Sequence, residues 1–157
     1  MADLTENLKS WLWKGFAIQT IGAVVSFLLL IIPTIILLGG SLFLILAAIA
    51  TGNIALLVSV IPLLIIWFIV ACFVNGWIIV SIDHGKIAKI EILPFMWKGL
   101  IYTIAIAIIG FILGFLSIQT NLLGATLLFV TNPLMAIISI PVALLISGLL
   151  VDKIGGD

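Results

Sequence analysis

Two long stretches without a charged side chain constrain this chain more than any other feature. Residues 15–82 and residues 99–151 contain no Asp, Glu, Lys, Arg or His. In water such a surface would need a polar covering, yet the whole chain has only six basic and six acidic residues. Hydrophobic residues make up 65% and charged residues 8% of the chain, whereas about a quarter of a soluble domain is charged. The sequence therefore predicts an all-α integral membrane protein whose partner is the lipid bilayer.

Prolines, glycines and polar turns divide these stretches into four predicted membrane crossings. A single helix over residues 16–50 would be about 52 Å long, against a hydrocarbon core of about 30 Å. We therefore expect a break at Pro33 or at Gly39-Gly40-Ser41. The predicted crossings are about 15–37, 62–82, 97–118 and 134–151. Short broken or interfacial helices accompany them, and the segments Ser41–Ile61 and Leu122–Val130 could be re-entrant, interfacial or spanning.

The chain resembles itself at two ordered places. Trp13-Lys14-Gly15-Phe16 recurs as Trp97-Lys98-Gly99-Leu100, and each copy opens a long apolar run. Further along, Asn53 precedes Pro62 by the same spacing that separates Asn132 from Pro141. These matches predict a single membrane domain over residues 1–157, built from repeat halves at about 9–82 and 93–153.

The lysines predict the orientation of the helices. They fall into three zones, near the N-terminus, in the polar segment 83–98 and at the C-terminus, and the loops at 39–53 and 119–132 have none. The positive-inside rule places all three zones, and both termini, on the cytoplasmic side. Each half then crosses twice, so the two repeats are parallel rather than inverted. The predicted interface anchors are Trp11, Trp13, Lys14, Trp77, Trp97 and Lys98, whereas Trp67 is expected to pack between helices.

Small residues spaced four apart mark possible helix contacts. Gly22 with Ser26, Gly110 with Gly114 and Ala143 with Ser147 would each allow a neighbouring backbone to approach closely. Such pairs serve packing inside one bundle as well as association between copies, and the sequence leaves both open. We also expect Gln19, Asn75 and Gln119 to form hydrogen bonds between helices.

The sequence contains little that could carry chemistry. Asp83-His84 is the only carboxylate–imidazole pair, and adjacent residues do not share a helix face. No second His or Cys stands at metal-ligand spacing, and Cys72 lies in an apolar run where a buried thiol is expected. We therefore predict no enzyme activity, no cofactor and no metal site. A formal net charge of zero also argues against nucleic acid as a partner.

The stretch from Gly76 to Leu100 resembles a motif of uncharacterised small archaeal polytopic membrane proteins. The resemblance lies in an apolar helix end followed by Gly85, then Leu93-Pro94-Phe95 and Gly99-Leu100. The family has no assigned activity, so the resemblance implies only an archaeal membrane setting. Isoleucine, which is unusually abundant, fits the same source.

Two functions remain open from the sequence. The first is a non-enzymatic structural protein that self-associates or joins other membrane proteins, as an accessory subunit or as a membrane-shaping or envelope component. The alternative is a small homo-oligomeric channel or carrier, because unwound backbone at a broken helix can bind ions without an intramembrane charge. Its path would be lined at the predicted helix breaks by Asn53, Pro62, Asn132 and Pro141.

Overall fold

The computed structural model describes residues 2–156, with side chains from Leu4 onward, and every regular element in that part is helical. In order these are α1 (Ala2–Ala17), π-turn η1 (Ile18–Gly22), α2 (Ala23–Pro33), π-turn η2 (Thr34–Leu38), α3 (Gly39–Thr51), α4 (Ala55–Val58), α5 (Val60–Asp83), α6 (Ile92–Gly114), α7 (Leu122–Thr131) and α8 (Pro133–Gly155). In the part of the chain that the structure describes, four helical segments are long and apolar enough to cross a membrane: Leu4–Thr51, Ala55–Asp83, Ile92–Gly114 and Pro133–Gly155. The all-α class and the number of candidate crossings are thus as predicted.

The break expected in the first crossing is absent, and that prediction was wrong. Elements α1 to α3 form one helix of 48 residues from Leu4 to Thr51, about 72 Å long at 1.5 Å per residue. Pro33 ends α2, and the π-turn η2 directly after it absorbs the missing hydrogen bond. Gly39 and Gly40 continue the helix, because a lipid-exposed break would leave backbone groups unpaired in hydrocarbon.

The two short segments left open by the sequence have different structures. Most of Ser41–Ile61 belongs to the end of α3 and to the one-turn helix α4, separated by Gly52 at a left-handed φ of 68°. It is therefore part of a helical hairpin rather than a separate surface helix. Leu122–Val130 lies in α7, whose 10 residues are too few to span the hydrocarbon core. α7 packs against α8 with Ala125 fully buried.

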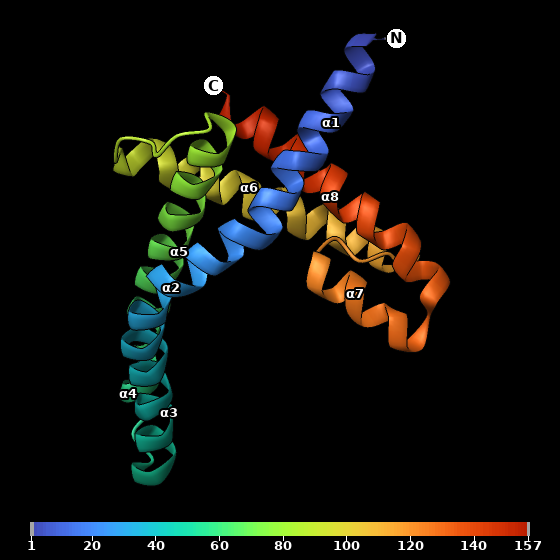
Figure 1. Cartoon of the computed structure of the whole chain (residues 1–157). Helices are drawn as coiled ribbons and strands as arrows, with labels where there is room; N and C mark the ends of the chain where they lie inside the picture. Colours follow the sequence, from blue (N-terminus) through green and yellow to red (C-terminus); the bar gives the residue numbers. More distant parts are fainter. Residues whose placement is uncertain (1, 157) are drawn as a thin grey trace.

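The helices are arranged as two groups that meet near the ends of the chain (Figure 1). α1 crosses α8, and α5 crosses α6, so each of these contacts joins the first part of the chain to the second (Figure 1). The hairpin of α3, α4 and the first half of α5 extends away from α6, α7 and α8 (Figure 1). Asp83 at the end of α5 and the C-terminal end of α8 come together beside α1.

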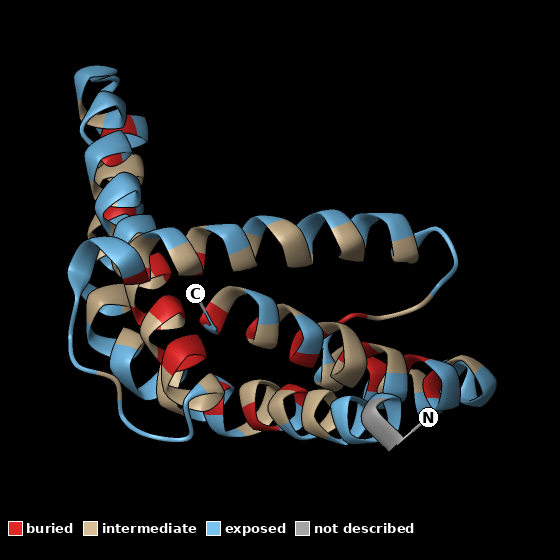
Figure 2. Ribbon diagram, turned by 90° about the horizontal axis from the view of Figure 1, so that it is seen from above, coloured by how far each residue is buried: buried red, intermediate tan, exposed pale blue. Residues whose placement is uncertain are grey.

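The core is narrow and made mostly of small residues. Buried positions lie along the lines where helices touch, while most of each helix faces outward (Figure 2). Ala136, Ser139, Ala143, Ser147 and Val151, all on α8, have no exposed surface at all. Small side chains let helices approach closely, which is the usual basis of packing in lipid, where apolar burial alone gives little driving force.

Candidate functional site: a charged junction and an intramembrane polar groove

A charged junction ties three helices together where α1 crosses the ends of α5 and α8. The ammonium group of Lys14 donates to Asp83 Oδ1 at 2.5 Å and also forms an ion pair with Asp152. The side chains of Lys14 and Asp83 are 16% and 8% exposed, so water screens this pair little. Trp11 Nε1 donates to the other carboxylate oxygen of Asp152 at 3.2 Å. The junction thus fixes the relative position of α1, α5 and α8.

Four of the six predicted interface anchors bond to other parts of the chain, and two are exposed on the surface. Trp77 Nε1 donates to the carbonyl oxygen of Ala88 at 3.0 Å, and Lys98 Nζ donates to that of Gly155 at 3.1 Å. Together with Trp11 and Lys14, these side chains join helix ends to one another. Trp13 and Trp97 are 64% and 58% exposed, so they are not packed between helices, and their role as anchors stays a prediction.

Two glycine crossings, which the sequence reading missed, bring the two parts of the chain into backbone contact. A Cβ atom on Gly148 would overlap the carbonyl oxygen of Trp11 and lie 2.9 Å from the Gly15 amide nitrogen. A Cβ atom on Gly99 would overlap the carbonyl oxygen of Cys72 and lie 2.9 Å from the Gly76 amide nitrogen. No four-residue spacing marks these pairs, because the two glycines of each pair lie on different helices.

The small-residue pairs predicted from spacing behave differently from one another. A Cβ on Gly22 would lie 3.2 Å from the side chain of Ile78 on α5. Ser26 Oγ donates at 3.1 Å to Asn75 Oδ1, which is also on α5. Ala143 and Ser147 are fully buried on α8.

The third pair, on α6, makes no such contact between helices. A Cβ on Gly110 would meet Thr120 Oγ1 at 3.0 Å, in the turn that precedes α7. A Cβ on Gly114 would have nothing within 4 Å. Of the two roles left open for this pair, packing against another helix of the same chain is not observed, and association between copies stays a prediction.

Gln19 joins three segments inside the membrane region. Its Nε2 atom donates to Ser147 Oγ at 2.6 Å and to the carbonyl oxygen of Thr120 at 3.2 Å. Its Oε1 atom accepts from the amide of Leu122 at 3.3 Å, at the first residue of α7. Hydrogen bonds between helices were expected for Gln19, Asn75 and Gln119. The side chains of Gln19 and Asn75 form them, whereas Gln119 bonds to α8 through its backbone amide, which donates to Ser139 Oγ at 3.1 Å.

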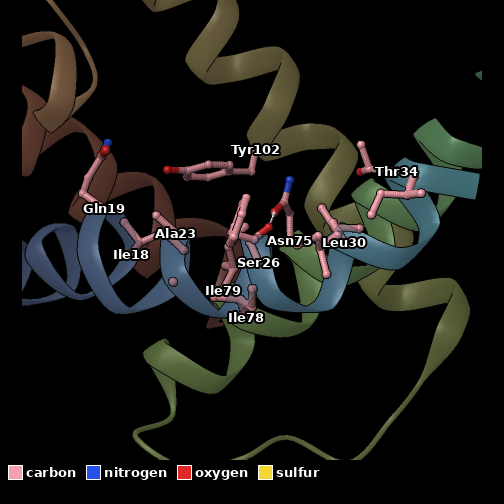
Figure 3. A pocket seen from close by; sticks show the side chains of 14 residues that line it. Ile18, Gln19, Ala23, Ser26, Leu30, Thr34, Asn75, Ile78, Ile79 and Tyr102 are labelled. Atoms are coloured by element: carbon pink, nitrogen blue, oxygen red, sulfur yellow. Dashed lines mark hydrogen bonds between the residues drawn. The ribbon is translucent and has the colours of Figure 1, made fainter. Parts of the chain in front are cut away.

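Beside Gln19 lies a groove of about 420 Å³ between the first helix, α5 and α6 (Figure 3). Its floor is apolar, and its polar groups are Gln19 at one end, Ser26 and Asn75 in the middle, Thr34 at the other end, and Tyr102 opposite. The Asn75 amide nitrogen points into the groove (Figure 3). Tyr102 is the one titratable side chain of the lining, so the groove suits an apolar molecule better than acid–base chemistry.

The four residues predicted to line a permeation path are not brought together in one chain. Asn53 accepts from the amide of Ala55 at 3.1 Å in the turn before α4, whereas Asn132 caps α8 by accepting from the amide of Met135 at 3.3 Å. All four residues, including Pro62 and Pro141, are exposed. The α4 tip and the turn between α7 and α8 lie at opposite ends of the molecule (Figure 1).

The remaining polar candidates do not form a reaction centre. Asp83 is engaged with Lys14, and His84 is exposed in the loop that follows. Among the residues described, no group of three His, Cys, Asp or Glu is arranged to bind a metal ion. Cys72 is buried, as expected for a thiol within an apolar helix.

The chain was compared with family models, curated proteins and solved structures, and none of them matches it. Its function is therefore inferred from its own residues and their geometry.

Proposed function

We propose that this protein is a non-enzymatic structural component of a membrane, either an accessory subunit of a membrane complex or a membrane-shaping or envelope component. The observation that carries this proposal is how its polar side chains are used. Lys14, Asp83 and Asp152 pair with one another across three helices, and Gln19 and Asn75 bond to other helices. These five side chains hold helices together, so they are not available for transport or catalysis.

The length and surface of the α3–α4–α5 hairpin support association with other proteins or with further copies. From Lys14 to Thr51 the helix covers about 55 Å, well beyond a hydrocarbon core of about 30 Å. The far end remains apolar, with Phe43 70% exposed and Ile49 74% exposed. The helix is thus longer than the hydrocarbon layer is thick, and either strong tilting or a partner that covers the apolar end would accommodate the excess length. We propose that a second copy of the chain is this partner.

We also propose that the chain is a tandem duplication with both termini on the cytoplasmic side. Each Trp-Lys-Gly motif makes the same pair of contacts. Gly15 packs against α8 and Gly99 against α5, which in each case is the last helix of the other half. Lys14 binds Asp83 and Lys98 binds the carbonyl oxygen of Gly155, and in each case the partner lies at the end of the lysine's own half. Lys14 also binds Asp152, at the end of the other half. Gathering these motifs at one end of the molecule is what two parallel halves of two crossings require.

The structural role is tested by purifying the full chain in a mild detergent and reconstituting it in lipid nanodiscs. We expect assemblies larger than one chain, measured as protein mass by light scattering. Phe43→Gln on the hairpin should dissociate them, whereas Phe111→Gln on α6, an equally exposed phenylalanine, should not. A monodisperse monomer of the unchanged protein in both media would refute self-association.

The channel or carrier alternative has less support, because its four residues are exposed and apart. It requires several copies to bring Asn53 and Asn132 to one path. In proteoliposomes it predicts solute or ion flux that Asn53→Ala and Asn132→Ala abolish. Since Asn132 caps α8 and Asn53 stabilises the turn before α4, the flux must be compared at equal amounts of folded protein.

A further inference from the structure

We propose that the loop between α5 and α6 forms a binding site for an anionic phospholipid. The loop and the first turns of α6 enclose a cavity of about 430 Å³. Its charged and polarisable lining consists of His84, Lys86, Lys89, Glu91 and Lys98. The loop directly follows a spanning helix and precedes another, which puts the cavity at the level of the lipid headgroups.

The charge of this cavity is unbalanced in favour of an anion. Leaving aside Lys98, whose ammonium group is engaged, two lysines, Lys86 and Lys89, line the cavity with a single carboxylate, that of Glu91. Lys86 and Lys89 are exposed, whereas Lys98 is held by the carbonyl oxygen of Gly155. Asp83, the carboxylate just before the loop, is already paired with Lys14. A phosphate group would supply the missing negative charge, as it does in basic pockets between membrane helices.

The apolar residues around the lysines favour a lipid over a free phosphate ion. Ile87 and Ile90 alternate with the lysines in the loop and are 82% and 72% exposed, so they are free to enter the acyl layer. A second groove of about 190 Å³ lies between α5 and α6, formed only by apolar surface. Leu93 and Trp97 line this groove, and Pro94 and Lys98 on the same turns of α6 line the basic cavity. Apolar surface of this kind suits the acyl chain of a lipid and offers nothing to a free phosphate ion.

The proposal is tested by native mass spectrometry of the full chain, released from micelles that contain equal amounts of phosphatidylglycerol and phosphatidylcholine. We expect the unchanged protein to retain phosphatidylglycerol in preference. In the double variant Lys86→Gln, Lys89→Gln, retention should fall about thirty-fold, the effect of removing two interfacial lysines. The matched double variant Lys9→Gln, Lys153→Gln removes the same charge elsewhere and should retain the lipid. The double variant Lys86→Arg, Lys89→Arg should retain it as well.

Three results would overturn the proposal. Equal retention of both lipids by the unchanged protein would show that charge is not recognised. An equal loss of phosphatidylglycerol in the two glutamine double variants would show that retention depends on the overall charge of the protein and not on this loop. Complete displacement of phosphatidylglycerol by millimolar inorganic phosphate would identify an anion site with no preference for lipid. A thermal unfolding curve followed by tryptophan fluorescence confirms that each variant compared is folded.

Discussion

Gly15 and Gly148 face each other where α1 crosses α8, and the backbones of the two helices touch there. A Cβ atom on either glycine would overlap a carbonyl oxygen of the facing helix, that of Leu144 or that of Trp11. The residues just before these glycines make polar interactions at the same contact. Lys14 forms an ion pair with Asp152 on α8, and Ser147 accepts a hydrogen bond from Gln19. The glycines thus set the distance at which the polar groups of α1 and α8 can meet.

Gly148→Ala should destabilise the protein strongly. The added methyl group would meet backbone rather than a movable side chain, so the helices must separate, and we expect a loss of at least about 2 kcal/mol in the free energy of unfolding. Unfolding in mixed micelles with increasing dodecyl sulfate, followed by tryptophan fluorescence, measures this loss. Gly114→Ala is the matched control on α6, since nothing lies within 4 Å of its Cβ, and it should be neutral or slightly stabilising. Similar losses for both substitutions would disprove the crossing.

Lys14→Met should cost more stability than removal of any other lysine. It would leave two carboxylates, Asp83 and Asp152, together without a cation, and breaking such a pair typically costs about 3–5 kcal/mol when it is buried. Because Asp152 is 31% exposed, we expect the lower end of that range. Lys9→Met, at an exposed position on the same helix, provides the comparison. Unfolding in mixed micelles with increasing dodecyl sulfate measures both losses of stability. An equal loss for Lys14→Met and Lys9→Met would show that the ion pairs of Lys14 do not stabilise the fold.

Gln19→Leu should loosen the start of α7 as well as destabilise the whole chain. Three hydrogen bonds are lost, to Ser147, Thr120 and Leu122, each worth about 0.6–2 kcal/mol in a membrane protein. Hydrogen exchange should therefore rise at residues 120–124 relative to the rest of the chain. The neighbouring Thr20→Val removes a hydrogen bond only to Phe16 in its own helix, so it should leave exchange there unchanged. If hydrogen exchange at residues 120–124 is unaltered in Gln19→Leu, Gln19 does not hold the start of α7 in place.

Single cysteines test the proposed orientation, since Cys72 is the only natural one and can be replaced by Ala. An impermeant maleimide applied to sealed vesicles should label Lys9→Cys, Lys89→Cys and Lys153→Cys from the same, cytoplasmic side. Ala50→Cys, exposed near the tip of the hairpin, should be labelled from the opposite side. If Lys89→Cys reacts from the side opposite to Lys9→Cys, the arrangement of two crossings in each half is wrong.

The sequence predicted the features that depend on composition and on local spacing. Charge-free stretches of membrane length require helices in lipid whatever their neighbours are, so the class and the four candidate crossings followed directly. Gln19 and Asn75 were recognisable because an amide within an apolar helix must find a partner. The spacing of Gly110 and Gly114 could not tell packing inside the chain from association between copies, because small residues four apart permit close contact without requiring it.

Only the tertiary structure decided how the helices meet. The sequence predicted a break near Pro33, yet the helix continues, since a π-turn satisfies the backbone at lower cost than an opening in hydrocarbon. It gave no sign that Gly15 faces Gly148 or that Gly76 faces Gly99, because each contact joins residues distant along the chain. The charged stretches marked the membrane boundary, but the pairing of Lys14 with Asp83 and Asp152 depends on how three helices cross. Lipid as the solvent is a property of composition, whereas the choice of helix partners is a property of shape.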